Sequence, residues 1–270
     1  MTRPAPSAGK TSRPAVGARP ADFSRRYGWR AKIGLISPAI LDTSAEQMRK
    51  ILPEGVLLSA ITISMPIQRL GPEQGTRAFD LMIEGGKRLA AEKVDALICG
   101  GAAVAVMKGV DGDREMEQAL RRETGLPLVM ANGAILEALR HLKARSVIAI
   151  SPFIEPRNQE IADFLNASGY SCLAAEGLGL TKNVDFASQP PEAALRLGLK
   201  TARAHPDADA IYIACPRWPT VDIIETLERE TGKPVISAPA AWIWGALKAL
   251  DIRECSPGYG RLLDELRAGQ

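Results

Sequence analysis

The stretch that decides the fold is Asp209-Ala-Ile-Tyr-Ile-Ala-Cys-Pro-Arg-Trp-Pro-Thr-Val221. Its residues 210–214 are apolar and partly β-branched, which is typical of a buried strand. Cys215 and two prolines end that strand, and residues 221–232 continue with apolar side chains at helical spacing. Pro219 fits the first turn of such a helix, where an N–H would have no partner. The pattern predicts a strand, a loop that carries Cys215 and a helix, and open α/β sheets bind ligands at that edge.

Parts of this stretch occur a second time in the chain. Asp95-Ala and Asp209-Ala are 114 residues apart, and Ile36-Ser-Pro and Ile150-Ser-Pro have the same separation. Two independent matches at one offset indicate a duplicated structural unit.

The repeat also pairs the two loops that follow the central strands. At the same offset Cys215 corresponds to Gly101. Arg122-Glu-Thr-Gly and Arg229-Glu-Thr-Gly are 107 residues apart, so the first copy carries about seven extra residues before this motif. Two similar lobes related by a pseudo-twofold axis would bring the two loops together across one cleft.

From residue 32 the pattern alternates between strand and helix, which predicts an α/β fold with two pseudo-symmetric lobes, each a parallel sheet flanked by helices. The expected divisions are a disordered tail at 1–28, a first lobe at 29–145, a second lobe at 146–255 and a C-terminal segment at 256–270. The predicted strands are 33–37, 56–64, 96–99, 128–131, 147–151, 171–174, 210–214 and 235–238. The predicted helices are 44–52 (with Thr43 as N-cap), 76–93, 114–123, 134–142, 157–168, 191–205, 221–232 and 240–250. Residues 176–190 show no clear period and are long enough to lie over a cleft.

Composition excludes several classes of protein. The 270 residues carry a net charge of only +3, and much of the positive excess lies in residues 1–31, so nothing suggests a nucleic-acid-binding face. That arginine-rich tail also fits an organelle transit peptide. There is no apolar run long enough for a membrane span. The cysteines are scattered and only two histidines exist, which argues against a metal site and fits a reducing cytoplasm.

Cys215 admits two interpretations. A cysteine that ends a buried strand can be a small core residue. Alternatively, a thiol at a helix N-terminus beside Arg217 is in a setting that lowers the thiol pKa. A thiol that still carries its proton can donate it to carbon. Arg217 has a planar fork suited to a carboxylate, unless it points into solvent.

Cys99 is the candidate second thiol, because it ends the corresponding strand of the first repeat. Its alternative is a core position below the cleft. The adjacent Gly100-Gly101 pair allows a close approach of the backbone to a ligand, and its amides could hold a carboxylate.

Several motifs carry a family resemblance. They are Lys93-Val-Asp-Ala-Leu, Glu123-Thr-Gly-Leu-Pro, Leu178-Gly-Leu-Thr181, Cys215 and Pro257-Gly-Tyr-Gly-Arg-Leu-Leu. Over about residues 32–265 the chain resembles the aspartate/glutamate racemase superfamily, in the branch with arylmalonate decarboxylase and maleate cis-trans isomerase. Racemases and isomerases of this superfamily carry a cysteine in each lobe, whereas the decarboxylase has a glycine in the first. The Gly101/Cys215 pairing is similar to the decarboxylase.

The resemblance implies a cofactor-free decarboxylation of a small malonate-type (arylmalonate-like) dicarboxylic acid through a planar enediolate, with Cys215 as proton donor. It implies a small carboxylic acid as the partner, no nucleic acid, no membrane, no metal and a cytoplasmic location, and it allows a homo-oligomer. The expected substrate-binding residues are Ser37, Pro38, Gly100, Gly101, Ala102, Ala103, Ser151, Phe153, Pro216 and Arg217.

The chain departs from the decarboxylase pattern in its carboxylate cradle. Alanines replace two hydroxyl residues at 102 and 103, Phe153 replaces a tyrosine, and Pro216-Arg217 replaces two glycines. We expect Arg217, Ser37, Ser151 and the amides of 101–103 to supply some of the lost donors. The departures leave two alternatives open. One is a maleate isomerase or an amino-acid/hydantoin racemase-like isomerase that uses Cys215, with or without Cys99. The other is a binder of small carboxylates without turnover.

Overall fold

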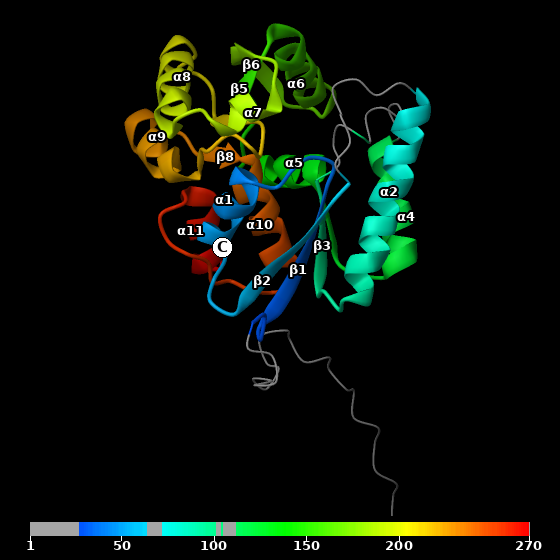
Figure 1. Ribbon diagram of the computed structural model, residues 1–270. Helices are drawn as coiled ribbons and strands as arrows, with labels where there is room; N and C mark the ends of the chain where they lie inside the picture. The colour runs from blue at the N-terminus through cyan, green and yellow to red at the C-terminus, as the bar shows by residue number, and fades with distance from the viewer. Residues whose placement is uncertain (1–26, 64–71, 101–103, 105–111, 270) are drawn as a thin grey trace, which may run out of the picture.

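The computed structural model describes residues 27–63, 72–100, 104 and 112–269 (Figure 1). The predicted tail at 1–28 therefore lies almost wholly outside the described residues, and so do Gly101, Ala102 and Ala103.

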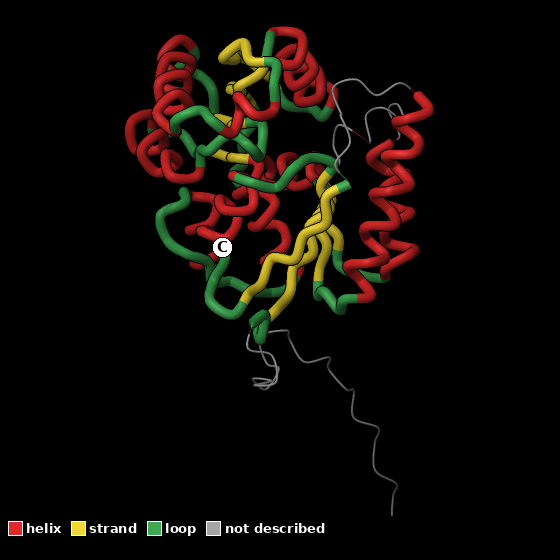
Figure 2. The backbone as a smooth tube through the Cα atoms, viewed as in Figure 1, coloured by secondary structure: helices red, strands yellow, loops and turns green. Residues whose placement is uncertain are grey.

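The first half of the chain builds one four-stranded parallel sheet, in the order β2-β1-β3-β4. Its elements are β1 (Ala31–Ser37), α1 (Thr43–Ile51), β2 (Val56–Thr62), α2 (Pro72–Ala91), β3 (Ala96–Cys99), α4 (Gly112–Thr124), β4 (Leu128–Met130) and α5 (Ala131–His141). In Figure 2 this sheet lies between the pair α2–α4 and a group of helices that includes α10 of the second half.

The second half builds an equivalent parallel sheet, in the order β6-β5-β7-β8. Its elements are β5 (Ser146–Phe153), α6 (Glu155–Ala167), β6 (Ser171–Leu180), α7 (Asn183–Ala187), α8 (Pro191–Ala204), β7 (Ala210–Ile213), the 3₁₀-helix η3 (Val221–Ile223), α9 (Ile224–Thr231), β8 (Val235–Ser237), α10 (Ala238–Ala249) and α11 (Arg261–Ala268). The predicted α/β fold with two parallel sheets is confirmed. The division into domains at residue 145 stays a prediction.

The sequence repeat appears as matched backbone hydrogen bonds. Gly100 N–H donates to the carbonyl of Ile36 at 2.8 Å, and Ala214 N–H donates to the carbonyl of Ile150 at 2.9 Å. Both pairs keep the offset of 114 residues. They join the central strand of each sheet to the residue after its neighbour, so Gly100 and Ala214 occupy equivalent positions.

An aspartate closes the opposite end of each strand pair. The Asp95 carboxylate accepts from the backbone N–H of Lys32 at 2.8 Å, and Asp209 accepts from the N–H of Ser146 at 2.8 Å. The Asp-Ala repeat in the sequence therefore marks a structural role, a carboxylate that satisfies the first amides of a parallel strand.

The two halves share one hydrophobic core. Its members come from both sheets and include residues of α5 and α10, the helices that Figure 1 shows between the sheets. Helix α10 of the second half packs on the first sheet: a Cβ at Gly245 would lie 3.2 Å from Val129. Trp242 Nε1 donates to the carbonyl of Ala131 at 3.2 Å, at the start of α5. The lobes are therefore interlocked through these two helices.

Trp242→Phe should lower the free energy of unfolding by about 1–2 kcal/mol, because it removes a buried hydrogen bond and part of a core side chain. Trp29→Phe is the matched control, since Trp29 is 42% exposed and its change should cost less than about 0.5 kcal/mol. Urea unfolding of both variants tests this. Equal losses in the two would show that α10 does not lock the lobes together.

Three local expectations are wrong. Residues 176–190 are not irregular: β6 runs on to Leu180 and α7 follows, with Phe186 against Phe153 at 5.1 Å between ring centroids. The N-cap of α1 is Asp42 rather than Thr43, because its carboxylate accepts from the N–H of Thr43 at 2.8 Å.

The helix after Cys215 also starts later than Pro219. Trp218 N–H closes a turn on the carbonyl of Cys215 at 3.2 Å. The next free amides, those of Thr220 and Val221, donate to the side chain of Gln47 at 2.7 and 3.2 Å, and the chain then enters η3 before α9.

Two features of the described residues bear on membrane and metal-binding functions. No described helix combines the length and the apolar character that crossing a bilayer requires. Within the same residues, no three His, Cys, Asp or Glu side chains gather as metal ligands.

Candidate active site

Cys215 follows the end of β7 at the carboxyl edge of the second sheet. It has a φ of 77°, in the left-handed region that is costly for a residue with a Cβ. Such a conformation costs on the order of 1–3 kcal/mol and persists only where the surrounding structure holds it. The residue at the equivalent sequence position is Gly101, a type that adopts left-handed backbone freely. Lys93, Lys143 and Asp251 also adopt positive φ, so the conformation makes Cys215 a candidate functional position only together with its place at the sheet edge.

The backbone amides of Arg217 and Trp218 lie near Cys215, and that of Trp218 donates to the carbonyl of Cys215 at 3.2 Å. Burial of the thiol nevertheless dominates and raises the pKa of Cys215 to about 11; these amides and the charge of Arg217 act in the opposite direction. The predicted lowering of this pKa is therefore wrong. No helix begins at Cys215, and Asp42 beside Arg217 offsets part of the favourable charge. The thiol carries its proton at neutral pH.

Alkylation of Cys215 by iodoacetamide should keep accelerating up to about pH 11, because only the thiolate reacts. A thiol with an ordinary pKa of about 8.5 would level off near pH 9. Mass spectrometry of the Cys215 peptide gives the rate at each pH, and the partly exposed Cys172 provides an internal comparison. A plateau below pH 9.5 would contradict the effect of burial.

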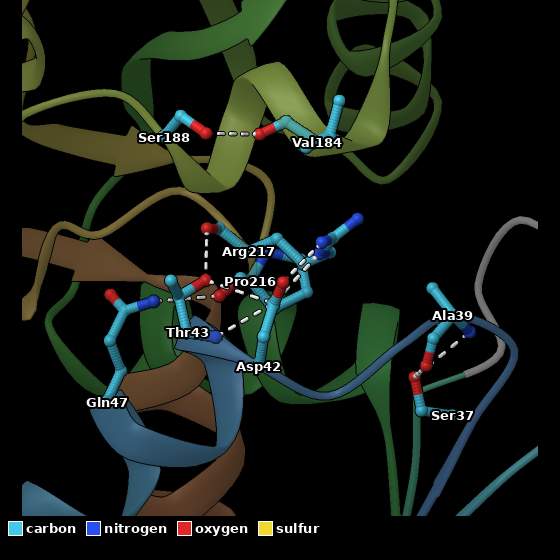
Figure 3. A network of polar contacts seen from close by, with 9 residues as sticks. All are labelled: Ser37, Ala39, Asp42, Thr43, Gln47, Val184, Ser188, Pro216 and Arg217. Atoms are coloured by element: carbon cyan, nitrogen blue, oxygen red, sulfur yellow. Dashed lines mark hydrogen bonds and ion pairs between the residues drawn. The ribbon is translucent and has the colours of Figure 1, made fainter.

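Arg217 is nine-tenths buried and forms a bidentate ion pair with Asp42 (Figure 3). Its Nε donates to Oδ1 at 3.0 Å and its Nη2 to Oδ2 at 2.5 Å. The hydrogen bond from Arg217 is the main reason that the pKa of Asp42 lies below its usual value. The option of a side chain in solvent is wrong, because Arg217 is buried and a carboxylate of the first lobe occupies one edge of its guanidinium. The role of Arg217 in binding a substrate carboxylate stays a prediction.

The Nη1 edge of the guanidinium is not used by Asp42. Asp42 uses one side of the fork, and among the described residues none accepts a hydrogen bond from Nη1 of Arg217. A guanidinium has five N–H donors, so the Nη1 edge can still pair with a second carboxylate.

The hydroxyl groups of the two serines in the Ile-Ser-Pro repeat both donate hydrogen bonds to acceptors within the protein. Ser37 Oγ donates to the carbonyl of Ala39 at 2.9 Å, and Ser151 Oγ donates to Asn158 Oδ1 at 2.5 Å. Each also accepts a backbone N–H two residues later. Because a hydroxyl has only one proton to donate, neither serine offers a free donor to a substrate carboxylate in this structure, and their role in substrate binding stays a prediction.

Cys99 is fully buried, and its sulfur lies 3.3 Å from the sulfur of Met116. It belongs to the smaller hydrophobic cluster between the first sheet and the helices α2 and α4. The proposal of Cys99 as a second thiol is corrected on this geometry: its side chain faces the covering helices.

The remaining predicted residues lie at the carboxyl edges. Phe153 ends β5, and Pro38 is buried directly after β1. Gly100 approaches Trp242 closely, since a Cβ there would lie 3.5 Å from the indole and 3.0 Å from the carbonyl of Ile36. Pro216 is half-buried and its carbonyl accepts from Gln47 at 2.9 Å.

Sequence reasoning missed the contribution of α1. Asp42, Thr43 and Gln47 all contact the loop 215–221, as Figure 3 shows for Pro216 and Arg217. Asp42 carries a recognisable signal, an acidic residue just before a helix. Gln47 carries none, because its partners lie about 170 residues away along the chain.

The family model described as arylmalonate decarboxylase matches residues 33–263. The chain belongs to the arylmalonate decarboxylase family. The match spans both sheets and includes Cys215.

The relatives are enzymes with two different activities. An arylmalonate decarboxylase of Bordetella bronchiseptica is 27% identical over 234 residues, 86% of this chain and 96% of that protein. A maleate isomerase of Nocardia farcinica is 28% identical over 240 residues, 86% of this chain and 95% of that protein. A solved structure of unliganded arylmalonate decarboxylase superposes with a TM-score of 0.76 at 26% identity, covering 87% of this chain and 99% of that one.

Proposed function

We propose that this protein is a cofactor-independent decarboxylase of a small malonate-type dicarboxylic acid, with Cys215 as the proton donor. One observation carries the proposal: a buried thiol that keeps its proton at neutral pH stands at the carboxyl edge of the second sheet, on a residue with a φ of 77°. A neutral thiol suits an acid that delivers a proton, whereas a nucleophilic cysteine requires the thiolate.

The proposed reaction has two steps. The bond between the central carbon and one carboxylate breaks, carbon dioxide leaves, and the electron pair stays on the substrate as an enediolate. The S–H bond of Cys215 then breaks, and its proton joins the central carbon on the face that the thiol addresses. The positive charge of Arg217 favours the thiolate that forms, and a proton from water restores the thiol.

The remaining carboxylate needs donors, since negative charge accumulates on its oxygens in the transition state. We assign this role to the Nη1 edge of Arg217; the amides of residues 101–103, which the sequence also predicts as donors, lie outside the described residues. The guanidinium geometry matches a carboxylate. Support for Arg217 comes from its orientation: Asp42 fixes one edge and leaves the other.

Maleate isomerisation is the second candidate, because the maleate isomerase relative is as similar as the decarboxylase. Two observations weigh against isomerisation. The raised pKa of Cys215 leaves little thiolate for nucleophilic addition, and the position of Cys99 in the hydrophobic core leaves no second thiol at the site. A binder without turnover is the third candidate, and the altered cradle supports it.

A substrate panel in D₂O without added cofactor separates the candidates. Proton NMR follows phenylmalonate, alkylmalonates, maleate and aspartate. We expect carbon dioxide release from a malonate, with one deuterium placed on the product carbon in a single configuration. Conversion of maleate to fumarate instead would assign the isomerase function, and no turnover of any of them would favour a binder.

We also propose a cytoplasmic location. The support is that all four cysteines are unpaired and that Cys215 must remain reduced to act.

A further inference from the structure

A buried polar pair stands next to the strand that leads to Cys215. The N–H of Ala214 donates to the carbonyl of Ile150 at 2.9 Å, so Ser151 of β5 lies alongside the residue that precedes Cys215. The Ser151 hydroxyl donates to Oδ1 of Asn158, on helix α6, at 2.5 Å. Ser151 is 1% exposed and Asn158 is 2% exposed, so both polar groups are shielded from water and depend on partners within the protein.

Ser151 and Asn158 together hold both backbone polar groups of Phe153. The N–H of Phe153 donates to Ser151 Oγ at 2.9 Å, and its carbonyl accepts from Nδ2 of Asn158 at 3.4 Å. A carbonyl only accepts, so the amide nitrogen of Asn158 faces Phe153 and the amide oxygen is left for the serine hydroxyl. The three hydrogen bonds form a closed network that fixes the peptide units on either side of Phe153.

The neighbouring strand β6 leaves room for this network. A Cβ at Gly177 would lie 2.1 Å from the carbonyl oxygen of Phe153 and 2.4 Å from Nδ2 of Asn158, so no side chain fits at that position. The ladder between β5 and β6 also shifts its register between Ser151 and Phe153. A second strand is therefore shaped around the contact between Asn158 and Phe153.

The first repeat, in which the corresponding residues are also described, does not form this network. At the offset of 114 residues Asn158 corresponds to Ser44 on α1. The Ser37 hydroxyl closes its turn on Ala39, and the hydroxyl of Ser44 has no hydrogen-bond partner in the part of the chain that the structure describes. The network therefore belongs to the lobe that carries the thiol of Cys215 and is not a general property of the repeated fold.

The held backbone of Phe153 decides where its ring lies, because side-chain direction follows from the backbone. The ring meets that of Phe186, on α7, edge to face at 5.1 Å between centroids. Phe186 is buried, so the contact also joins α7 to the end of β5. Phe153 ends its strand at the carboxyl edge, where the sequence predicts that it binds substrate.

We infer that Asn158 is a positioning residue: it holds the turn at the end of β5 and thereby the ring of Phe153 at the carboxyl edge of the second sheet. Asn158 is buried and acts through Phe153. Its importance for turnover rests on the proposed function, in which Phe153 is an expected substrate-binding residue. Its effect on the ring can be measured without a substrate, so the two ideas can fail separately.

Asn158→Ala removes both hydrogen bonds of the amide, and NMR of the phenylalanine rings measures the result. The chain has five phenylalanines, so selective ¹³C labelling gives few ring signals, and Phe153→Leu and Phe186→Leu identify two of them. In the unmodified protein we expect a nuclear Overhauser effect between these two rings, and Asn158→Ala should lose it while circular dichroism shows a folded protein. On the best malonate, kcat/KM should fall by about 10- to 100-fold, the scale of a misplacement of about 1 Å.

Ser151→Ala is the second variant and Asn166→Ala the matched control. Ser151→Ala removes only a hydroxyl, so it should fold even if Asn158→Ala does not, and it should lose the same ring contact. Asn166 also lies on α6, but its side chain accepts from the N–H of Cys172 near the start of β6, at 3.0 Å. In Asn166→Ala the ring contact and kcat/KM should equal those of the unmodified protein.

Three results would overturn the inference. They are a ring contact that persists in folded Asn158→Ala or Ser151→Ala, an equal loss of the contact in Asn166→Ala, and an unchanged kcat/KM in Asn158→Ala on a malonate that the unmodified protein converts. If the unmodified protein converts no malonate, the proposed function fails, and the ring contact alone decides whether Asn158 positions Phe153.

Discussion

Cys215→Ala should lower kcat on the true substrate by roughly 10²–10⁴-fold, the usual contribution of a general acid. The physical reason is that no other described thiol lies at this sheet edge: Cys99 is in the core against Met116, and Cys255 is buried under the C-terminal segment. Alanine keeps the Cβ and the left-handed backbone, so the melting temperature should change little. Steady-state kinetics on the best substrate of the malonate panel measure the loss.

Two further variants sharpen this prediction. Cys215→Ser keeps the shape and the hydrogen bonds but replaces the thiol by a much weaker acid, so it should be nearly as inactive. Cys172→Ala should retain full activity, because Cys172 lies in β6 and its sulfur bonds to the carbonyl of Ala174. Substantial turnover in Cys215→Ala would remove the thiol from the mechanism.

The repeat explains how much of the fold is readable from sequence. Asp95-Ala and Asp209-Ala sit at one offset because each aspartate performs the same task at the foot of a strand, so local chemistry left a local signal. The strands are short apolar runs between turn residues, and their positions agree with the pattern to within a few residues, except β6. That strand alternates exposed and half-buried residues only weakly and forms an edge of its sheet.

The site was harder to predict because its properties depend on packing between distant segments. The thiol pKa follows from burial, which the residues around position 215 do not encode alone. The partner of Arg217 lies 175 residues away on the other lobe. By residue type, Ser37 and Ser151 are possible hydrogen-bond donors to a substrate carboxylate. In the structure their hydroxyl groups donate to Ala39 and Asn158 instead. Residue type therefore placed the site at the carboxyl edge of the sheets. Which side chains there are free to bind a substrate depends on tertiary contacts that residue type does not reveal.

Arg217→Met should raise KM for a dicarboxylate by roughly 10- to 150-fold, equivalent to about 1.5–3 kcal/mol for a hydrogen bond to a charged group. Methionine fills much of the buried volume of the side chain, so the loop should keep its place. The ion pair with Asp42 adds little to stability, about 1 kcal/mol or less, since the Asp42 side chain is 40% exposed and screened by solvent. Arg217→Lys should rescue binding only in part, because an ammonium lacks the planar fork.

Asp42→Asn distinguishes a substrate-binding arginine from a purely structural ion pair. Asparagine keeps an oxygen that accepts from the Nε of Arg217 but removes the negative charge of Asp42. The positive charge of the guanidinium is then no longer neutralised by a neighbour, so it attracts a substrate carboxylate more strongly. If Arg217 binds the carboxylate, KM should stay the same or fall in Asp42→Asn while it rises in Arg217→Met. If the pair serves only to join the lobes, both variants should change KM and the melting temperature in the same direction and to a similar degree. In that case the backbone amides at the two sheet edges would have to hold the acid without help from a charged side chain.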